Sequence, residues 1–135
     1  MSAPDGARSV SEVEAMLTPA LPTGPPVPVE RRVDFRALRP LGEEFVDDCL
    51  TARTPGAQIR IVYPASGRAV TFGAGDIFTH AVVYIPTDQP FFAVEPVTNA
   101  NDAFTLHEQG TPRSGLVVLQ PGEGLRGSIW LEVER

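Results

Sequence analysis

Lysine is absent from this sequence of 135 residues, and all eleven basic side chains are arginine. The absence excludes a Schiff base formed on lysine and a lysine that holds a phosphate group. Acidic residues number 17, and the formal net charge is -6 at pH 7. Nucleic acids and anionic membranes are bound through basic surfaces. We therefore expect neither of them as a partner.

Cysteine and long apolar runs are equally scarce. Cys49 is the single cysteine, which excludes an intramolecular disulfide and a cysteine-rich zinc site. No apolar run approaches the ~20 residues of a membrane-spanning helix. The N-terminal segment lacks the basic and apolar regions of a signal peptide. A lone thiol is typical of a reducing compartment, and we expect a cytoplasmic protein.

Turn-forming residues are frequent, with 12 glycines and 14 prolines. This usage favours short strands separated by turns. Residues 1–16 are expected to form a disordered leader, and residues 17–135 a single domain. The run LPTGPPVPVE over residues 21–30 excludes a helix and a central strand there, because each proline removes a backbone donor.

Six short strands are predicted from alternating apolar side chains and the turns between them. They cover residues 58–63, 68–72, 78–85, 91–95, 115–120 and 125–134. The connections are too short for helical crossovers, so the strands are expected to pair antiparallel. The predicted fold class is all-β, an antiparallel β-sandwich with one short helix.

Two helical segments are expected beside these strands. One is a single turn around residues 43–48, and the other is the short helix, within residues 99–109 with Asn101 as its N-cap. The last strand alternates cleanly, and its inward-facing residues are expected to be Ile129, Leu131 and Val133.

Glu95 is the strongest candidate for chemistry. It ends the apolar strand FFAV and precedes Pro96, which holds Glu95 in an extended conformation. Alternation places it on the face of Phe91 and Ala93. A carboxylate on such an apolar face would have its pKa raised by desolvation, into a range useful for a general base. The alternative is a solvated glutamate at the end of a strand.

The remaining polar candidates favour structural roles. Asp47 and Asp48 are expected to point to opposite faces of an extended chain and not to share one site. With no histidine or cysteine at ligand spacing, we expect no metal site. His80 is expected to be half-buried with its hydrogen bonds satisfied, His107 to lie near a helix C-terminus, and Cys49 to be an unreactive thiol.

Three segments together resemble the C-terminal part of the aldose 1-epimerases, also called galactose mutarotases. VVYIPTDQPFFAVEPVTNANDAF over residues 82–104 is similar to the family's strand that ends in Glu-Pro-x-Thr with Asp-Ala-Phe shortly after. Residues 21–50 are similar to its Pro-Thr-Gly, Asp-Phe-Arg and Asp-Asp-Cys region. LVVLQPGEG over residues 116–124 is similar to its Leu-x-Pro-Gly-Glu turn.

The resemblance implies a large antiparallel β-supersandwich, of which this chain forms the C-terminal part. It implies an isomerase that interconverts the α and β anomers of free aldohexoses such as glucose and galactose, in carbohydrate metabolism and without a cofactor. By position, the resemblance implies Glu95 as the general base. It implies Asp47 as the aspartate that accepts hydrogen bonds from sugar hydroxyls.

The N-terminal portion of that family supplies a histidine acid and lies outside the resemblance; neither His80 nor His107 occupies a matching position. Two alternatives therefore stay open, a non-catalytic carbohydrate-binding β-sandwich and a truncated remnant that lacks the histidine acid. Half of a supersandwich leaves sheet edges and apolar faces uncovered, so we also expect self-association.

Overall fold

A computed structural model describes Pro22 and residues 25–135 of the chain. The leader predicted over residues 1–16 lies outside the described residues. Two three-stranded antiparallel sheets with one short α-helix form the fold, which confirms the predicted all-β class. The first sheet has the order β1-β4-β5, and the second has the order β2-β3-β6. The strands are β1 (Val46–Leu50), β2 (Ile59–Tyr63), β3 (Arg68–Ala74), β4 (His80–Ile85), β5 (Ala93–Val97) and β6 (Ile129–Glu134).

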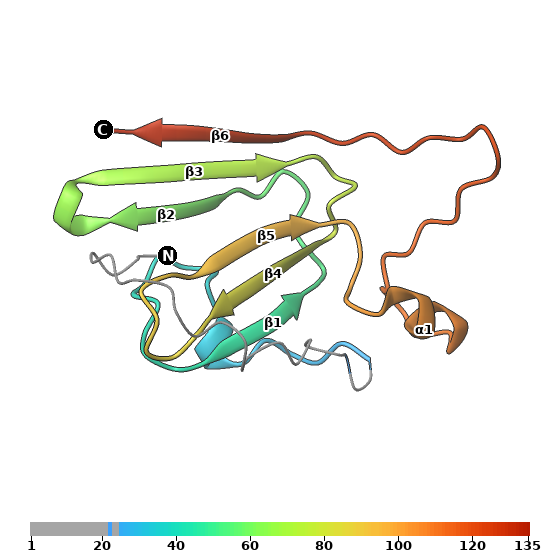
Figure 1. Cartoon of the computed structure of the whole chain (residues 1–135), viewed down its shortest axis with the longest axis horizontal. Helices are drawn as coiled ribbons and strands as arrows, with labels where there is room; N and C mark the ends of the chain where they lie inside the picture. Colours follow the sequence, from blue (N-terminus) through green and yellow to red (C-terminus); the bar gives the residue numbers. More distant parts are fainter. Residues whose placement is uncertain (1–21, 23–24) are drawn as a thin grey trace.

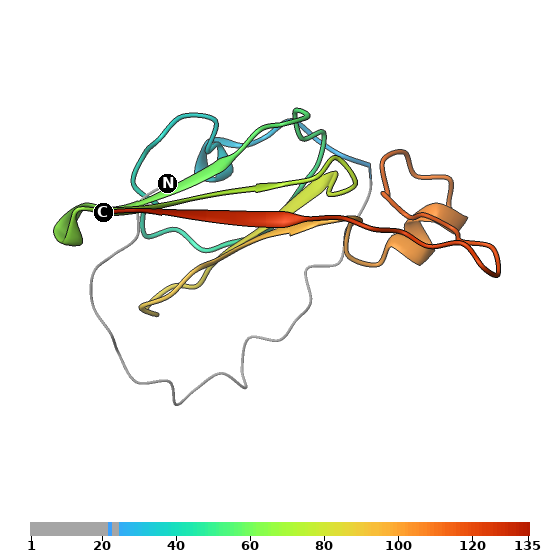
Figure 2. The ribbon, with the colours of Figure 1, turned by 90° about the horizontal axis from the view of Figure 1, so that it is seen from above.

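The hydrophobic core lies between the two sheets. Val46 and Val83 of the first sheet are 0% and 2% exposed, and Ile61 and Phe72 of the second sheet belong to the same cluster. Val33 of the 3-10 turn η1 (Arg31–Val33) adds to the cluster. Figure 1 shows β2, β3 and β6 side by side, with β1, β4 and β5 inclined to them, and Figure 2 shows that crossing from above.

Strand β1 replaces the helical turn predicted around residues 43–48, and that prediction is wrong. Val46 pairs with Ile85 and Leu50 with Ala81, so residues 46–50 form an edge strand of the first sheet. Burial of the β-branched Val46 in the core outweighs the weak local preference for a helix.

The apolar run predicted as a strand at residues 115–120 forms no strand. Its side chains Val117 and Val118 are 53% and 63% exposed. The run begins at Gly115, whose φ is +75°, and the preceding Ser114 carbonyl accepts a hydrogen bond from the backbone N–H of Ala100. This turn directs the segment away from both sheets, so alternating apolar side chains find no partner strand.

Strand β6 forms within the predicted range 125–134, and its alternation places Ile129, Leu131 and Val133 on one face opposite Ala74, Phe72 and Val70. The expected burial of that face is wrong. Leu131 is 69% exposed and Val133 is 63% exposed. The reason is that β6 is an edge strand beyond β3, whereas the core cluster ends at β3.

The short helix α1 (Ala103–Glu108) lies within the predicted range. Its N-cap is Asp102, with φ +52°, instead of the expected Asn101. Ala103 and Leu106 are its buried residues. Within the described residues, no helix is long and apolar enough to cross a membrane.

Candidate functional site

The two residues singled out for sugar chemistry lie on one face of the first sheet. Asp47 is opposite Tyr84, and Tyr84 is opposite Ala93; in the next row, Cys49 is opposite Val82, and Val82 is opposite Glu95. Residues directly opposite each other share a face, as do residues two apart in one strand. Asp47 and Glu95 therefore project to the same side from the two edge strands. Standard sheet spacing gives about 12 Å between their Cα atoms.

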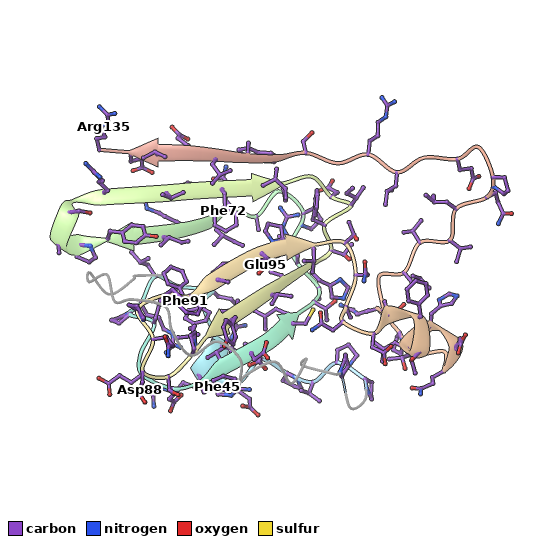
Figure 3. The ribbon with its side chains drawn as sticks, viewed as in Figure 1. Phe45, Phe72, Asp88, Phe91, Glu95 and Arg135 are labelled. Carbon is purple, nitrogen blue, oxygen red and sulfur yellow. The ribbon has the colours of Figure 1, made fainter. Side chains whose placement is uncertain are left out.

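This face is the outer side of the first sheet. The core residues Val46 and Val83 belong to the other set of alternating positions and point toward the second sheet. Glu95 lies in the middle of β5 (Ala93–Val97) instead of ending the strand as predicted, and it is exposed to solvent (Figure 3). The predicted burial of Glu95 on an apolar face is therefore wrong for the described residues, and the alternative of a solvated glutamate describes it.

Asp47 has a different environment from Glu95. Its side chain is half-buried, and burial raises the pKa of this carboxyl, with a further contribution from the negative charge of Asp48. Asp48 points to the other face, where Arg32 donates two hydrogen bonds to it, with N–O distances of 2.6 and 3.0 Å. The predicted separation of the two aspartates onto opposite faces is confirmed.

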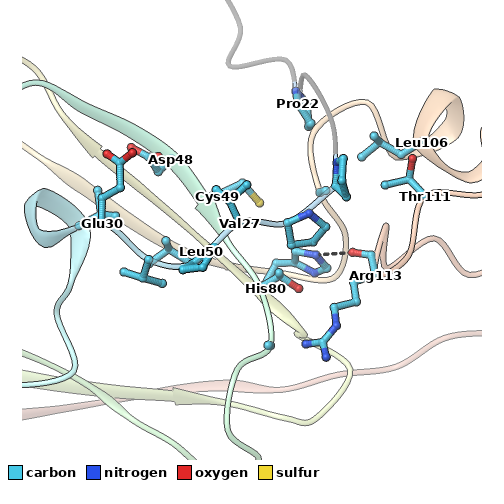
Figure 4. A pocket seen from close by; sticks show the side chains of 18 of the residues that line it. Pro22, Val27, Glu30, Asp48, Cys49, Leu50, His80, Leu106, Thr111 and Arg113 are labelled. Atoms are coloured by element: carbon cyan, nitrogen blue, oxygen red, sulfur yellow. Dashed lines mark hydrogen bonds between the residues drawn. The ribbon is translucent and has the colours of Figure 1, made fainter.

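A cavity of about 870 Å³ lies between the proline-rich run and the outer edge of β1 (Figure 4). Asp47 and Asp48 both line this cavity at the edge of β1, so the expectation that they would not share one site is wrong for this cavity; Glu95 does not line it. Other residues of its wall include Val27, Cys49, His80, Leu106 and Arg113. The two predicted site residues thus share a sheet face but not this cavity.

His80 is a buried and fully bonded histidine at the start of β4, 2% exposed. Its Nε2 lies 2.9 Å from the Arg113 carbonyl oxygen, a contact drawn in Figure 4, and its Nδ1 lies 2.7 Å from the Thr79 hydroxyl. Burial lowers its pKa, which favours the neutral ring. The expectation that its hydrogen bonds are satisfied is confirmed, although the ring is buried instead of half-buried. His107 lies in the last turn of α1, as expected, and is exposed.

The single thiol does not have the environment of a nucleophile. Cys49 is half-buried, and burial raises the pKa of its thiol, so the reactive thiolate is disfavoured. Within the part of the chain that the structure describes, no group of three histidine, cysteine, aspartate or glutamate side chains is placed to hold a metal ion.

The structure adds an aromatic cluster that the sequence did not reveal. The ring centroids of Phe45 and Tyr84 are 6.2 Å apart in a T-shaped pair, and those of Tyr84 and Phe91 are also 6.2 Å apart. Tyr84 lies opposite Asp47 on the outer face, and Phe45 and Phe91 precede β1 and β5 at one end of the sheet (Figure 3). Phe45 and Phe91 keep 45% and 40% of their surface exposed.

The outer face thus combines exposed aromatic surface with two carboxylates. Aromatic rings offer apolar area, and ionised carboxylates accept hydrogen bonds from hydroxyl groups. No protein-family model, curated protein or solved structure matches this chain.

Proposed function

We propose that the chain forms the C-terminal part of an aldose 1-epimerase-like β-supersandwich and contributes a base and a sugar ligand to mutarotation of free aldohexoses. One observation carries the proposal: Asp47 and Glu95, which the resemblance pairs functionally, project from the same face of one sheet in neighbouring rows. The cytoplasmic location expected from the lone thiol is part of the same proposal.

Glu95 acts as the general base in this scheme. Its carboxylate accepts the proton of the anomeric hydroxyl, the bond from C1 to the ring oxygen breaks, and an acid protonates the ring oxygen. After rotation about the C1–C2 bond, the reverse steps close the sugar ring and give the other anomer. The histidine acid of the resembled family has no matching residue in this chain, so the acid comes from outside the described face.

Asp47 holds the sugar in this scheme. Its half-buried carboxylate accepts hydrogen bonds from sugar hydroxyls, and the neighbouring Tyr84 ring packs against a C–H face. Asp47 and Glu95 lie in neighbouring rows on the two strands that flank β4, so the sugar lies across β4. No cofactor takes part.

Polarimetry on freshly dissolved α-glucose and α-galactose tests the catalytic assignment. A positioned base contributes about 10²–10⁴-fold, so Glu95→Gln should lower any enzymatic rate by about that factor. Glu108→Gln, on the exposed end of α1, is the matched control and should leave the rate unchanged. An equal rate in wild type and Glu95→Gln contradicts the assignment of the base.

The aromatic cluster favours a second candidate, a non-catalytic carbohydrate-binding β-sandwich. Such a protein shows saturable sugar binding in NMR titrations but no exchange between anomers above the spontaneous rate. Asp47→Ala and Tyr84→Ala should then weaken binding, while Glu95→Gln leaves it nearly unchanged. Anomer exchange that depends on Glu95 would reject this candidate.

A further inference from the structure

Strand β6 exposes an unusual amount of apolar surface for an edge strand. Ile129, Trp130, Leu131 and Val133 are 45%, 46%, 69% and 63% exposed. Within the described residues β6 pairs with β3 alone, so the backbone groups of its outer edge have no partner strand. Figure 1 shows β6 at the border of the molecule, with the preceding segment continuing along the line of the strand. An edge of this kind is a template for pairing with another chain.

We propose that β6 and the segment before it, residues 124–128, pair antiparallel with the same residues of a second copy of this chain, about a two-fold axis at Ile129. Each β6 then lies opposite residues 124–129 of the other copy. The two three-stranded sheets then join into one six-stranded sheet. Directly opposite residues must lie on the same face, so each odd-numbered residue of β6 must oppose an odd-numbered residue of the second copy. The possible registers therefore differ only by sliding one strand along the other in steps of two residues.

The charges around β6 select the register centred on Ile129. In this register Arg126 lies opposite Glu132 of the second copy. The two-fold axis repeats this pair, so two ion pairs form along the seam. Both side chains are exposed in the single chain. Glu123 adds no pair, because its carboxylate accepts a hydrogen bond from the backbone N–H of Gln120 in its own turn. Opposite charges directly across a strand pair stabilise it by about 0.2–1 kcal/mol each.

The neighbouring registers lack this match. Centring on Trp130 places Arg126 opposite Glu134, which Arg60 already binds within its own chain. Centring on Leu131 produces no pair of opposite charges, and centring on Glu132 places that carboxylate against its own copy. Like charges directly opposite each other are destabilising. The net charge of -6 also opposes association, so complementary pairs are needed for two copies to meet.

The apolar side chains agree with the same register. Leu125, which is 45% exposed, lies opposite Val133, and Ile129 lies opposite Ile129. Leu131 lies opposite Gly127, and a Cβ atom at Gly127 would meet the side chains of Ile77 and Phe78. Leu131 of one copy therefore packs beside Ile77 and Phe78 of the other. This continues the apolar face from Phe72 across the seam.

Charge reversal tests the proposal by sedimentation velocity over a range of concentrations. The wild-type chain should show a monomer–dimer equilibrium, and Arg126→Glu or Glu132→Arg should each weaken dimerisation by at least about tenfold. The double variant carrying both changes restores the pairs, and its dissociation constant should return to within about threefold of the wild-type value. Arg31→Glu changes an exposed arginine remote from β6. It alters the net charge by the same amount as Arg126→Glu and should dimerise like wild type.

Disulfide trapping tests the register itself. In a Cys49→Ser background, Ile129→Cys places two thiols opposite each other on the two-fold axis, and mild oxidation should give a covalent dimer. Leu131→Cys, which would lie opposite Gly127, should crosslink much more slowly. Circular dichroism confirms that each variant keeps its strands. A chain that stays monomeric at every concentration, a double variant that fails to recover, or faster crosslinking at residue 131 would overturn the proposal.

Discussion

Asp47 and Asp48 are adjacent in the chain, yet their side chains lie on opposite faces of β1 and have opposite electrostatic environments. Asp48 forms a two-point contact with the Arg32 guanidinium. Among the described residues no cation contacts Asp47, and its pKa is raised by burial and by the Asp48 charge. One carboxylate therefore stabilises the fold, while the ionised form of the other is disfavoured by its surroundings.

The first prediction compares the two aspartates. A carboxyl whose pKa is raised on folding binds protons more tightly in the folded state, so its contribution to stability falls as pH rises above the unfolded pKa of 3.8. Asp47→Asn should therefore raise the free energy of unfolding at pH 7, by no more than about 1 kcal/mol, and should have no effect near pH 3. Asp48→Asn should lower the free energy of unfolding at pH 7 by about 1 kcal/mol, because it removes the charged partner of Arg32.

Urea denaturation at pH 3 and pH 7 measures both effects. In the sugar assays, Asp47→Asn should weaken binding, whereas Asp48→Asn should leave binding unchanged in the folded fraction. A stability loss at pH 7 in Asp47→Asn would contradict the assigned environment of Asp47.

The second prediction concerns the buried His80. Burial lowers its pKa below the ordinary value of 6.5, so the unfolded chain binds a proton more readily than the folded chain. Stability is then fully present above about pH 6.5 and falls as pH drops toward the lower folded pKa. The free energy of unfolding should decrease between pH 7.5 and pH 5, and His80→Gln should remove the part of this slope that His80 causes. His107→Gln, at an exposed histidine, should keep the slope; an undiminished slope in His80→Gln would contradict the prediction.

The strand faces could be predicted from the sequence, but burial could not. Alternation correctly separates Asp47 from Asp48, and it correctly groups Leu131 with Val133. Whether a face is buried depends on what lies over it, and this is a property of the layers that local periodicity does not contain. Leu131 is exposed for this reason. Glu95 is exposed because it lies on the outer face of the first sheet.

The aromatic cluster could not be predicted because its geometry depends on a strand that was expected to be a helical turn. Once residues 46–50 pair with β4, Asp47 lies opposite Tyr84, and Phe45 reaches the same ring. A helical turn would have spread Phe45 and Asp47 around a helix axis. Conversely, the run at 115–120 has the apolar pattern of a strand but joins neither of the two described sheets, because pairing is a long-range property.

The third prediction concerns Gly115, which has φ +75° in a crowded position. A Cβ atom there would lie 2.6 Å from the Thr98 carbonyl oxygen and 2.8 Å from Cε1 of His80. Gly115→Ala should therefore combine backbone strain with a steric clash against main chain, and should lower the free energy of unfolding by about 3 kcal/mol or more. Gly110→Ala has φ +68° but open space around it, so it should lose only about 1 kcal/mol. Equal losses in the two variants, measured by thermal or urea unfolding, would contradict the contact assigned to Gly115.

The last prediction uses Trp130, the single tryptophan, as a reporter of the β3–β6 pair. Gly73 lies directly opposite it, and a Cβ atom at Gly73 would clash with Cζ2 of the indole ring. Gly73→Ala must displace the ring, and since Trp130 is already 46% exposed, the ring can swing into solvent without breaking the strand. Its fluorescence emission should shift to longer wavelength and become easier to quench with acrylamide, with a stability loss of about 1 kcal/mol.

Gly75→Ala serves as the control. A Cβ atom at Gly75 would have its nearest contact at 3.8 Å, so this variant should leave the emission unchanged. Unchanged emission in Gly73→Ala would show that the indole ring does not lie over Gly73 in solution.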